Sequence, residues 1–253
     1  MSGFISLPER TFKPRQNGLT MMIDGGLGLR QIKDVLELGE IYVDYVKLGW
    51  GTALVTPILG QKIDLYRKFG IRVCLGGTFF EVAHVQNKTE EYASFMKDLN
   101  IDLVEISDGT IDMEHTEKLK YIERFAKDFT VLSEYGSKDE GVIKAPHYWV
   151  KHMQAELDAG SWKVIGEGRE SGTAGMYRGS SELRTGLVDE IVDHLDTEQI
   201  IWEAPQKAQQ AWFIKKFGTN VNLGNIAAKD VIPLETLRLG LRSDTLRDFH
   251  TQS

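Results

Sequence analysis

The sequence predicts an α/β fold, a single (β/α)8 barrel of the TIM type with a short N-terminal arm. Short apolar runs recur eight times, about every 21 to 36 residues, with amphipathic helical segments between them. Charged or glycine-rich residues follow nearly every run, as they do at the mouth of such a barrel. No linker or low-complexity segment interrupts the repeat, so we assign residues 1–18 to the arm and residues 19–253 to one barrel.

The eight predicted strands are rich in apolar and β-branched residues and end in turn residues. They are residues 19–24, 45–50, 72–77, 103–109, 130–136, 163–169, 199–205 and 220–226. Because alternation of strands and helices cannot show that a sheet closes, a doubly wound open sheet stays the alternative.

The predicted helices show apolar residues at helical spacing and recognisable ends. Such spacing appears at Leu29, Ile32 and Leu36, at Tyr92, Phe95, Met96 and Leu99, at Leu119, Ile122, Phe125 and Ala126, and at Val150, Met153 and Leu157. Gly70, Gly160 and Gly218 each precede a strand and are expected to end a helix. Asn87 and Glu90 have the spacing of an N-cap and its reciprocal partner.

Composition indicates a globular protein without a membrane or nucleic-acid partner. The chain has 253 residues, of which 42% are hydrophobic and 26% charged, and its formal net charge of -7 lacks the basic character of nucleic-acid binders. No apolar run approaches the roughly 18 residues of a membrane span, and residues 1–18 lack the apolar core of a signal peptide. The single cysteine, Cys74, excludes an internal disulfide. We therefore expect a cytoplasmic protein.

Carboxylates and lysines gather where the predicted strands end. The charged residues at these ends are Asp24, Lys47, Glu81, Glu105, Asp108, Glu134, Glu167, Arg169 and Glu203. A carboxylate in an apolar strand is costly unless it is paired or binds a metal, so this set predicts a cation, paired lysines, or both. Salt bridges between neighbouring strands are the alternative for any single member.

Side-chain parity and ligand type narrow this prediction. Glu105 and Ser107 share one face of their strand, as do Glu167 and Arg169, and inward-pointing faces would meet at the barrel axis. The six histidines show no metal-like spacing, and an all-oxygen ligand set suits Mg²⁺ better than zinc or a redox metal. We expect Mg²⁺ to be bound by some of the following residues: Asp24, Glu105, Glu134, Glu167 and Glu203.

The segment VIGEGRESGTAG, residues 164–175, predicts an anion site at a strand end. Its glycines allow backbone N–H groups to approach a ligand, and Arg169 offers a planar guanidinium suited to carboxylate or phosphate. Arg169, Ser171 and Gly172 are the candidate binding residues. A solvated glycine-rich turn is the alternative for this loop alone.

Several motifs together resemble one enzyme family. In order, KLGWGT, GGTFFE, VEISDG, EGRESG, EAPQK, VNLGNI and ETLRLGLRSDT between Lys47 and Thr245 resemble phosphosulfolactate synthase, and the likeness extends from Leu19 to Thr245. The resemblance implies a TIM-type barrel, a homotrimer and dependence on Mg²⁺. It also implies addition of sulfite to phosphoenolpyruvate to give (2R)-phospho-3-sulfolactate, a step toward coenzyme M or sulfolactate.

The resemblance also implies residue roles. The family's general acid matches Lys138, which would protonate carbon 2 after sulfite attack, and Lys47 is the other candidate lysine. Such a lysine would need nearby cations to lower its pKa. Phosphate would lie near Gly224 and Asn225, by the last strands, as in many barrels.

Gly25 departs from the family pattern, which has a lysine there. This leaves open a related barrel enzyme acting on another enolpyruvate or phosphorylated acid. A non-catalytic relative is a further alternative.

Overall fold

The computed structural model describes residues 4–139, 144–169 and 171–250, and it confirms the predicted closed barrel. Eight parallel strands pair in sequence order, and β1 pairs with β8 to close the sheet. The strands are β1 (Thr20–Asp24), β2 (Tyr45–Leu48), β3 (Arg72–Leu75), β4 (Leu103–Ser107), β5 (Thr130–Tyr135), β6 (Lys163–Gly166), β7 (Ile200–Glu203) and β8 (Leu223–Ala227). Seven of them lie within the predicted runs, and β8 extends one residue beyond its run.

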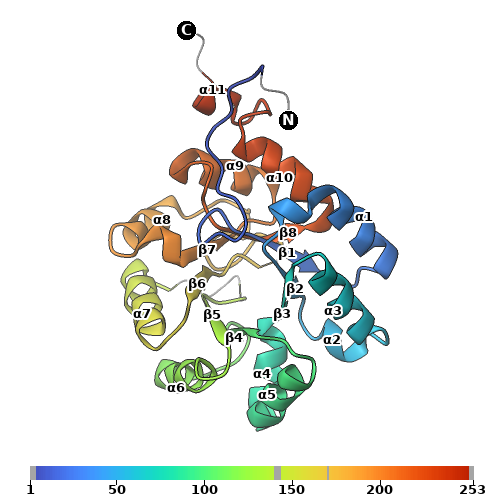
Figure 1. Ribbon diagram of the computed structural model, residues 1–253. Helices are drawn as coiled ribbons and strands as arrows, with labels where there is room; N and C mark the ends of the chain where they lie inside the picture. The colour runs from blue at the N-terminus through green and yellow to red at the C-terminus, as the bar shows by residue number, and fades with distance from the viewer. Residues whose placement is uncertain (1–3, 140–143, 170, 251–253) are drawn as a thin grey trace.

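Helices surround the barrel, as Figure 1 shows. They are α1 (Leu29–Gly39), α2 (Thr52–Val55), α3 (Leu59–Lys68), α4 (Gly77–Val85), α5 (Thr89–Asp98), α6 (His115–Phe125), α7 (Pro146–Asp158), α8 (Thr185–Val192), α9 (Lys207–Phe217), α10 (Val231–Arg238) and α11 (Leu246–Phe249). Short 3-10 helices lie at η1 (Glu40–Tyr42), η2 (Thr197–Gln199) and η3 (Ala228–Asp230).

The helix ends test the capping predictions. Gly70, Gly160 and Gly218 follow α3, α7 and α9 with positive φ, as expected. The predicted cap at Asn87 is wrong, because α5 begins at Thr89 after Lys88 and Asn87 adopts a φ of 56°.

Alternate residues of each strand point into the barrel. Inward side chains of the lower layer form a core that is separate from the apolar layer between sheet and helices. This inner core consists of Leu19, Met21, Tyr45, Cys74, Leu103, Leu132, Ile165 and Ile201. The next inward positions along β2, β4, β5 and β7 are charged, so the sequence alternation places an apolar plug beneath a charged mouth.

The N-terminal arm crosses the opposite end of the barrel. Arg10 pairs with Glu235 of α10 at 3.0 Å and donates to the carbonyl of Gly18, while Arg15 pairs with Asp44 at 2.9 Å. Ser6, Leu7 and Pro8 of the arm lie beside Asp248, Phe249 and His250 at α11 (Figure 1). The arm therefore covers the end at which the strands begin, and leaves the end at which they finish open.

Candidate active site

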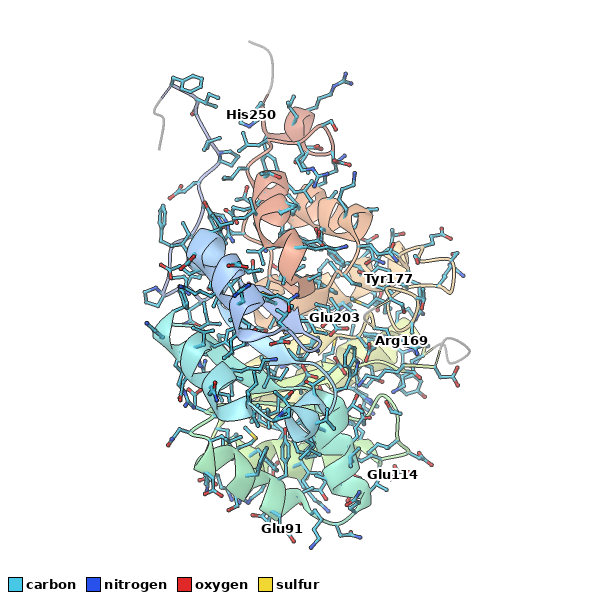
Figure 2. The ribbon with its side chains drawn as sticks, turned by 90° about the vertical axis from the view of Figure 1, so that its right-hand side faces the viewer. Glu91, Glu114, Arg169, Tyr177, Glu203 and His250 are labelled. Atoms are coloured by element: carbon cyan, nitrogen blue, oxygen red, sulfur yellow. The ribbon has the colours of Figure 1, made fainter. Side chains whose placement is uncertain are left out.

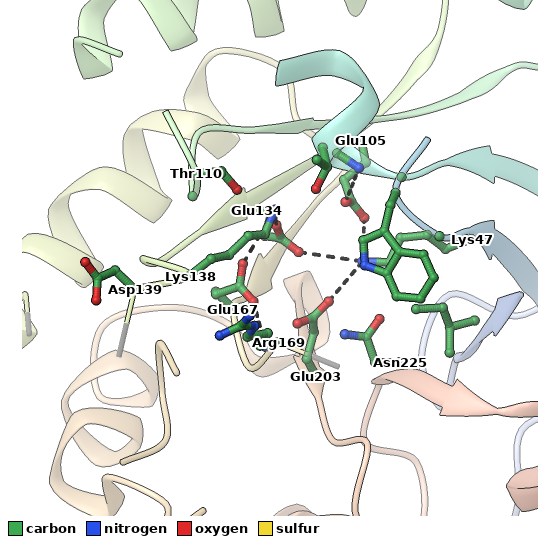
Figure 3. Close-up of a pocket in the computed structure, with 17 residues that line it drawn as sticks. Lys47, Glu105, Thr110, Glu134, Lys138, Asp139, Glu167, Arg169, Glu203 and Asn225 are labelled. Carbon is green, nitrogen blue, oxygen red and sulfur yellow. Dashed lines mark hydrogen bonds and ion pairs between the residues drawn. The ribbon is translucent and has the colours of Figure 1, made fainter. Parts of the chain in front are cut away.

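A buried lysine connects the carboxylates of the barrel mouth. Lys47 of β2 places its Nζ 3.0 Å from Glu105 Oε2, 2.9 Å from Glu203 Oε1 and 3.6 Å from Glu134 Oε1, as drawn in Figure 3. These residues come from four strands, and each is at most 5% exposed. The predicted convergence of the strand-end charges is confirmed for this group.

A second lysine reaches the same carboxylates from the β5–α7 loop. Lys138 Nζ lies 3.1 Å from Glu134 Oε2, 3.9 Å from Glu167 Oε2 and 3.3 Å from Glu81 Oε1. Its side chain is 21% exposed and lines the cavity described below, so this ammonium can reach a bound molecule. Figure 3 shows Lys138 extending toward Glu134 above Glu167.

Three glutamates can hold a metal ion at this mouth. Glu134, Glu167 and Glu203 each offer a carboxylate oxygen within 4.8 Å of the others, and all three are buried. Glu134 Oε2 and Glu167 Oε2 are both buried, and both lie near the ammonium of Lys138. Oxygen ligands at such spacing fit Mg²⁺. The predicted ligands Glu134, Glu167 and Glu203 are therefore together, with Glu105 beside them on Lys47.

The carboxylates of the mouth carry more negative charge than the lysines neutralise. Burial raises the pKa of Glu105 to about 7. Burial, with the carboxylates of Glu134 and Glu203, raises the pKa of Glu167 well above its usual range. Burial also raises the pKa of Glu203. Protons or a cation would relieve this excess, which is a physical reason to expect a cation here.

The pKa values of the two lysines are also raised, but by neighbouring carboxylates and against the effect of burial. Burial favours the neutral form of Lys138, but the carboxylates of Glu134, Glu167 and Glu81 outweigh burial and raise its pKa. The expectation that nearby cations lower the pKa of Lys138 is wrong for this structure, because its described neighbours at the mouth are acidic. Lys138 and Lys47 lower the pKa of Glu134 despite its burial.

A cavity of about 400 Å³ opens above the charges. Its wall includes Lys47, Lys138, Arg169 and Asn225 together with glutamates of the mouth. The remaining wall is formed by Ile23, Gly49, Trp50, Gly76, Gly77, Thr78, Gly109, Thr110 and Asp139. In Figure 2, Arg169 and Tyr177 lie toward the right-hand side and Glu203 lies nearer the middle, and the Tyr177 hydroxyl donates to the carbonyl of Glu203 at 2.6 Å.

Three residues of this wall have left-handed backbones. Trp50, Arg169 and Asn225 have φ values of 52°, 58° and 55°. Such conformations are uncommon for residues other than glycine and occur often at ligand sites. Trp50 and Arg169 follow the ends of β2 and β6, and Asn225 lies within β8 where its pairing with β1 shifts register, so all three side chains border the cavity.

The predicted anion-binding residues divide into two groups. Arg169 and Asn225 line the cavity, and Asn225 Oδ1 is buried without a hydrogen-bond partner among the described residues. Ser171 and Gly172 turn away from it, because their carbonyls accept hydrogen bonds from Gln206 and Gln209 beside and within α9. Gly224 faces the packed interior, where an added Cβ would lie 2.5 Å from Met21 Cε.

The predicted ligand Asp24 is not part of the cavity, which corrects its assignment. Its Oδ1 accepts the N–H groups of Gly26 and Leu27, and its Oδ2 contacts Lys62 Nζ and the Tyr66 hydroxyl, each at 2.8 Å. These contacts occupy both oxygens. Asp24 therefore secures the β1–α1 turn and α3.

Sequence reasoning missed Trp50 and misplaced Glu81. Trp50 follows Lys47 within the motif KLGWGT, and a motif-based search of strand ends could have found it. Glu81 was treated as a strand-end charge, but β3 stops at Leu75 and Glu81 lies in α4. The double glycine at Gly76 and Gly77 is the sequence signal for that early helix start.

Comparisons with known proteins identify one family of similar sequences. A family model described as (2R)-phospho-3-sulfolactate synthase (ComA) matches residues 8–244. The chain is 42% identical over 245 residues to the phosphosulfolactate synthase of Methanothermobacter thermautotrophicus, covering 94% of this chain and 95% of that protein. It is 43% identical over 244 residues to the phosphosulfolactate synthase of Bacillus subtilis, covering 95% and 97%.

A solved structure shares the fold. The 3-hexulose-6-phosphate synthase from Salmonella typhimurium superposes with a TM-score of 0.57 at 12% identity, covering 87% of this chain and 97% of that one. Among the described residues, no helix is long and apolar enough to cross a membrane.

Proposed function

The chain belongs to the (2R)-phospho-3-sulfolactate synthase family, and from this premise we propose that it adds sulfite to phosphoenolpyruvate to give (2R)-phospho-3-sulfolactate in a Mg²⁺-dependent reaction. The reaction forms a carbon–sulfur bond, so the enzyme would be of the carbon–sulfur lyase type in the reverse direction. One observation carries the proposal for this site: two lysines and Arg169 line one cavity together with four buried glutamates.

The reactants explain why such a site needs both signs of charge. Sulfite and phosphoenolpyruvate are both anions, and attack on the methylene carbon moves electrons toward the substrate carboxylate. When bound by Glu134, Glu167 and Glu203, Mg²⁺ would supply a Lewis acid for that carboxylate. Arg169 and Asn225 line the cavity beside this cluster and are the proposed contacts to the remaining anionic groups.

Lys138 is the proposed proton donor to carbon 2. It is a charged lysine with a raised pKa, its Nζ contacts Glu134, and its side chain borders the cavity. A proton delivered from Nζ to the carbon leaves a neutral amine, which the surrounding carboxylates would favour reprotonating. Lys47 has a different setting, because three glutamates hold its Nζ. We assign Lys47 to organising those glutamates, and keep it as the second candidate acid.

A direct assay tests this function. Purified protein would be incubated with phosphoenolpyruvate, sulfite and Mg²⁺, and the product would be followed by mass. A product with the mass of phosphosulfolactate that requires all three components supports the proposal. Turnover of phosphoenolpyruvate without sulfite would instead indicate a related enzyme with another substrate.

The family relationship also supports a homotrimer in the cytoplasm. Light scattering at micromolar protein concentration is expected to give three times the chain mass of 28.6 kDa. A monomer mass would contradict the trimer without affecting the proposed chemistry.

A further inference from the structure

A carboxylate on helix α4 contacts Lys138 from outside the group of candidate metal ligands. Glu81 is 1% exposed and lies in the apolar segment GTFFEVAHV, next to the buried Phe80. A carboxylate in such a place destabilises the fold by several kcal/mol unless its charge is compensated. The groups that contact Glu81 therefore show what compensates its buried charge.

Glu81 Oε1 has two partners, one in the barrel wall and one on a loop. The Ser107 hydroxyl at the end of β4 donates to it at 2.6 Å, and Lys138 Nζ lies 3.3 Å away. Ser107 is fully buried in the barrel wall, whereas Lys138 is on a loop. The hydroxyl thus orients the carboxylate, and the carboxylate in turn orients the ammonium.

The start of α4 is built for this approach. The N–H of Gly77 donates to Glu105 Oε1 at 2.7 Å, and a Cβ at this glycine would lie 2.4 Å from Ser107 Oγ. No side chain fits there without displacing β4. Because Gly77 has no side chain, the first turn of α4 lies directly on the end of β4. This brings Glu81, one turn later in α4, to Ser107.

The other carboxylates that contact Lys138 are also candidate metal ligands. Glu134 and Glu167 also contact its ammonium, but both belong to the group able to bind a cation. A cation bound there would repel the lysine. Glu81 is the described carboxylate contact of Lys138 that lies outside this group, so it can keep the ammonium at the cavity edge while the other two serve the cation.

We propose that Glu81, oriented by Ser107, is a positioning residue that holds the Lys138 ammonium at the edge of the cavity. This inference rests on the proposed function, in which Lys138 gives its proton to carbon 2. Glu81 does not line the cavity. Its removal should therefore lower kcat through Lys138 and leave substrate binding nearly intact.

A kinetic double-mutant cycle tests this coupling. Glu81→Gln keeps the shape of the side chain and should lower kcat about 10- to 100-fold, the range typical of residues that orient a functional group. KM for phosphoenolpyruvate should change less than about 3-fold. In a Lys138→Ala protein, Glu81→Gln should cause no further loss. Independent losses that multiply in the double variant, or a change confined to KM, would overturn the proposal.

Two more variants keep the test decisive. Ser107→Ala removes the orienting hydroxyl and should lower kcat by a smaller factor than Glu81→Gln. It should have no effect in the Lys138→Ala background. If Glu81→Gln does not fold, Ser107→Ala takes its place in the cycle. Glu156→Gln is the matched control, because Glu156 is equally buried and contacts Lys118 away from the cavity. Its kcat should stay unchanged, and a loss equal to that of Glu81→Gln would count against the proposal.

Thermal unfolding separates this inference from the proposed function. The change in Tm caused by Glu81→Gln should differ by more than about 2 °C with and without Lys138→Ala, since groups in contact are energetically coupled. This coupling requires no substrate. If the Tm changes are coupled but no product forms, the sulfite reaction is rejected and the Glu81–Lys138 contact is retained. If product forms but the two substitutions have additive effects, the positioning role is rejected.

Discussion

Strand β5 separates two buried charge clusters with different charge balance. On its inner side, the open cluster comprises Lys47 and Lys138 with Glu81, Glu105, Glu134, Glu167 and Glu203. On its outer side, the closed cluster comprises Lys118 of α6 with Asp108, Glu156 and His115. Glu134 touches both, because its carbonyl accepts a hydrogen bond from Lys118 while its carboxylate contacts Lys47 and Lys138.

The pKa shifts show what the difference means. In the closed cluster, Lys118 lies 2.8 Å from Glu156 and outweighs burial, so the pKa of Glu156 is lowered. In the open cluster, burial and neighbouring carboxylates raise the pKa values of Glu105, Glu167 and Glu203. In the closed cluster, the fold therefore favours the ionised form of Glu156. In the open cluster, burial opposes ionisation of these three glutamates, while Lys138 and Lys47 favour it for Glu134. The open cluster also faces a cavity, and pKa values shifted in this way are typical of functional sites.

The largest effect is expected in the open cluster. Lys138→Ala should lower kcat by roughly 10² to 10⁴, the range for a removed general acid, with little change in KM for phosphoenolpyruvate. Steady-state kinetics with product detected by mass would measure it. A near-normal kcat would move the acid to Lys47 and reduce Lys138 to a surface charge.

Replacing a carboxylate of the closed cluster should affect stability alone. Glu156→Gln leaves Lys118 buried beside Asp108 and should lower the free energy of unfolding by about 3 kcal/mol. Urea unfolding would measure the loss, and kcat of the folded protein should be unchanged. A stable Glu156→Gln protein with reduced kcat would erase the distinction between the clusters.

Arg169→Ala should act on binding more than on turnover. Because Arg169 borders the cavity, a substrate anion held by it is held in the ground state and transition state alike. We expect KM for phosphoenolpyruvate to rise at least about 10-fold, with incomplete rescue by Arg169→Lys, since lysine lacks the planar bidentate geometry. A fall in kcat at constant KM would place Arg169 in the chemical step instead.

The smallest effect is a difference in pH response. A carboxyl group with a raised pKa in the fold contributes stability that is complete below its unfolded pKa and lost as pH rises through its folded pKa. For Glu105, with a folded pKa of about 7, ligand-free protein should lose about 0.8 kcal/mol between pH 6.5 and 8.5. Glu156 has a lowered pKa, so its contribution is lost only as pH falls below the ordinary glutamate range.

Two details define the pH experiment. His152 has its pKa lowered to about 4 by burial and by His115, so it adds a stability change of opposite sign below pH 6.5. Urea unfolding from pH 6.5 to 8.5 excludes most of this contribution, and the remainder is common to wild-type protein and Glu105→Gln. Glu105→Gln should flatten the profile, and an equally steep profile in that variant would contradict the assignment.

The barrel could be predicted from the sequence because its strands repeat a local pattern. Side chains alternate between the two faces of a strand, so the sequence shows which residues face inward. For this reason Glu105, Glu134 and Glu203 could be expected to meet Lys47. Contacts made by helices carry no such signal. Lys62 and Tyr66 of α3 reach Asp24 from a neighbouring unit, and nothing in the strand pattern reveals this.

The conformations of loops and the starts of helices also could not be predicted from the sequence. The glycine-rich segment was predicted to bind anions throughout, but Gln206 and Gln209 draw Ser171 and Gly172 away from the cavity. Glu81 belongs to the site because α4 begins unusually soon after β3, a tertiary fit that depends on Gly77 lying against Ser107. Lys138 was assigned through the family resemblance, and only its contacts with Glu134 and Glu81 give it a physical setting.

Calorimetric titration of Mg²⁺ tests the central claim most directly, namely that the open cluster is incomplete without a cation and the closed cluster is not. Wild-type protein and Glu156→Gln should bind Mg²⁺ with matching affinity in the presence of phosphoenolpyruvate, and Glu167→Gln should bind it at least about 10-fold more weakly. No Mg²⁺ binding by wild-type protein, with or without phosphoenolpyruvate, or unchanged affinity in Glu167→Gln, would contradict the account.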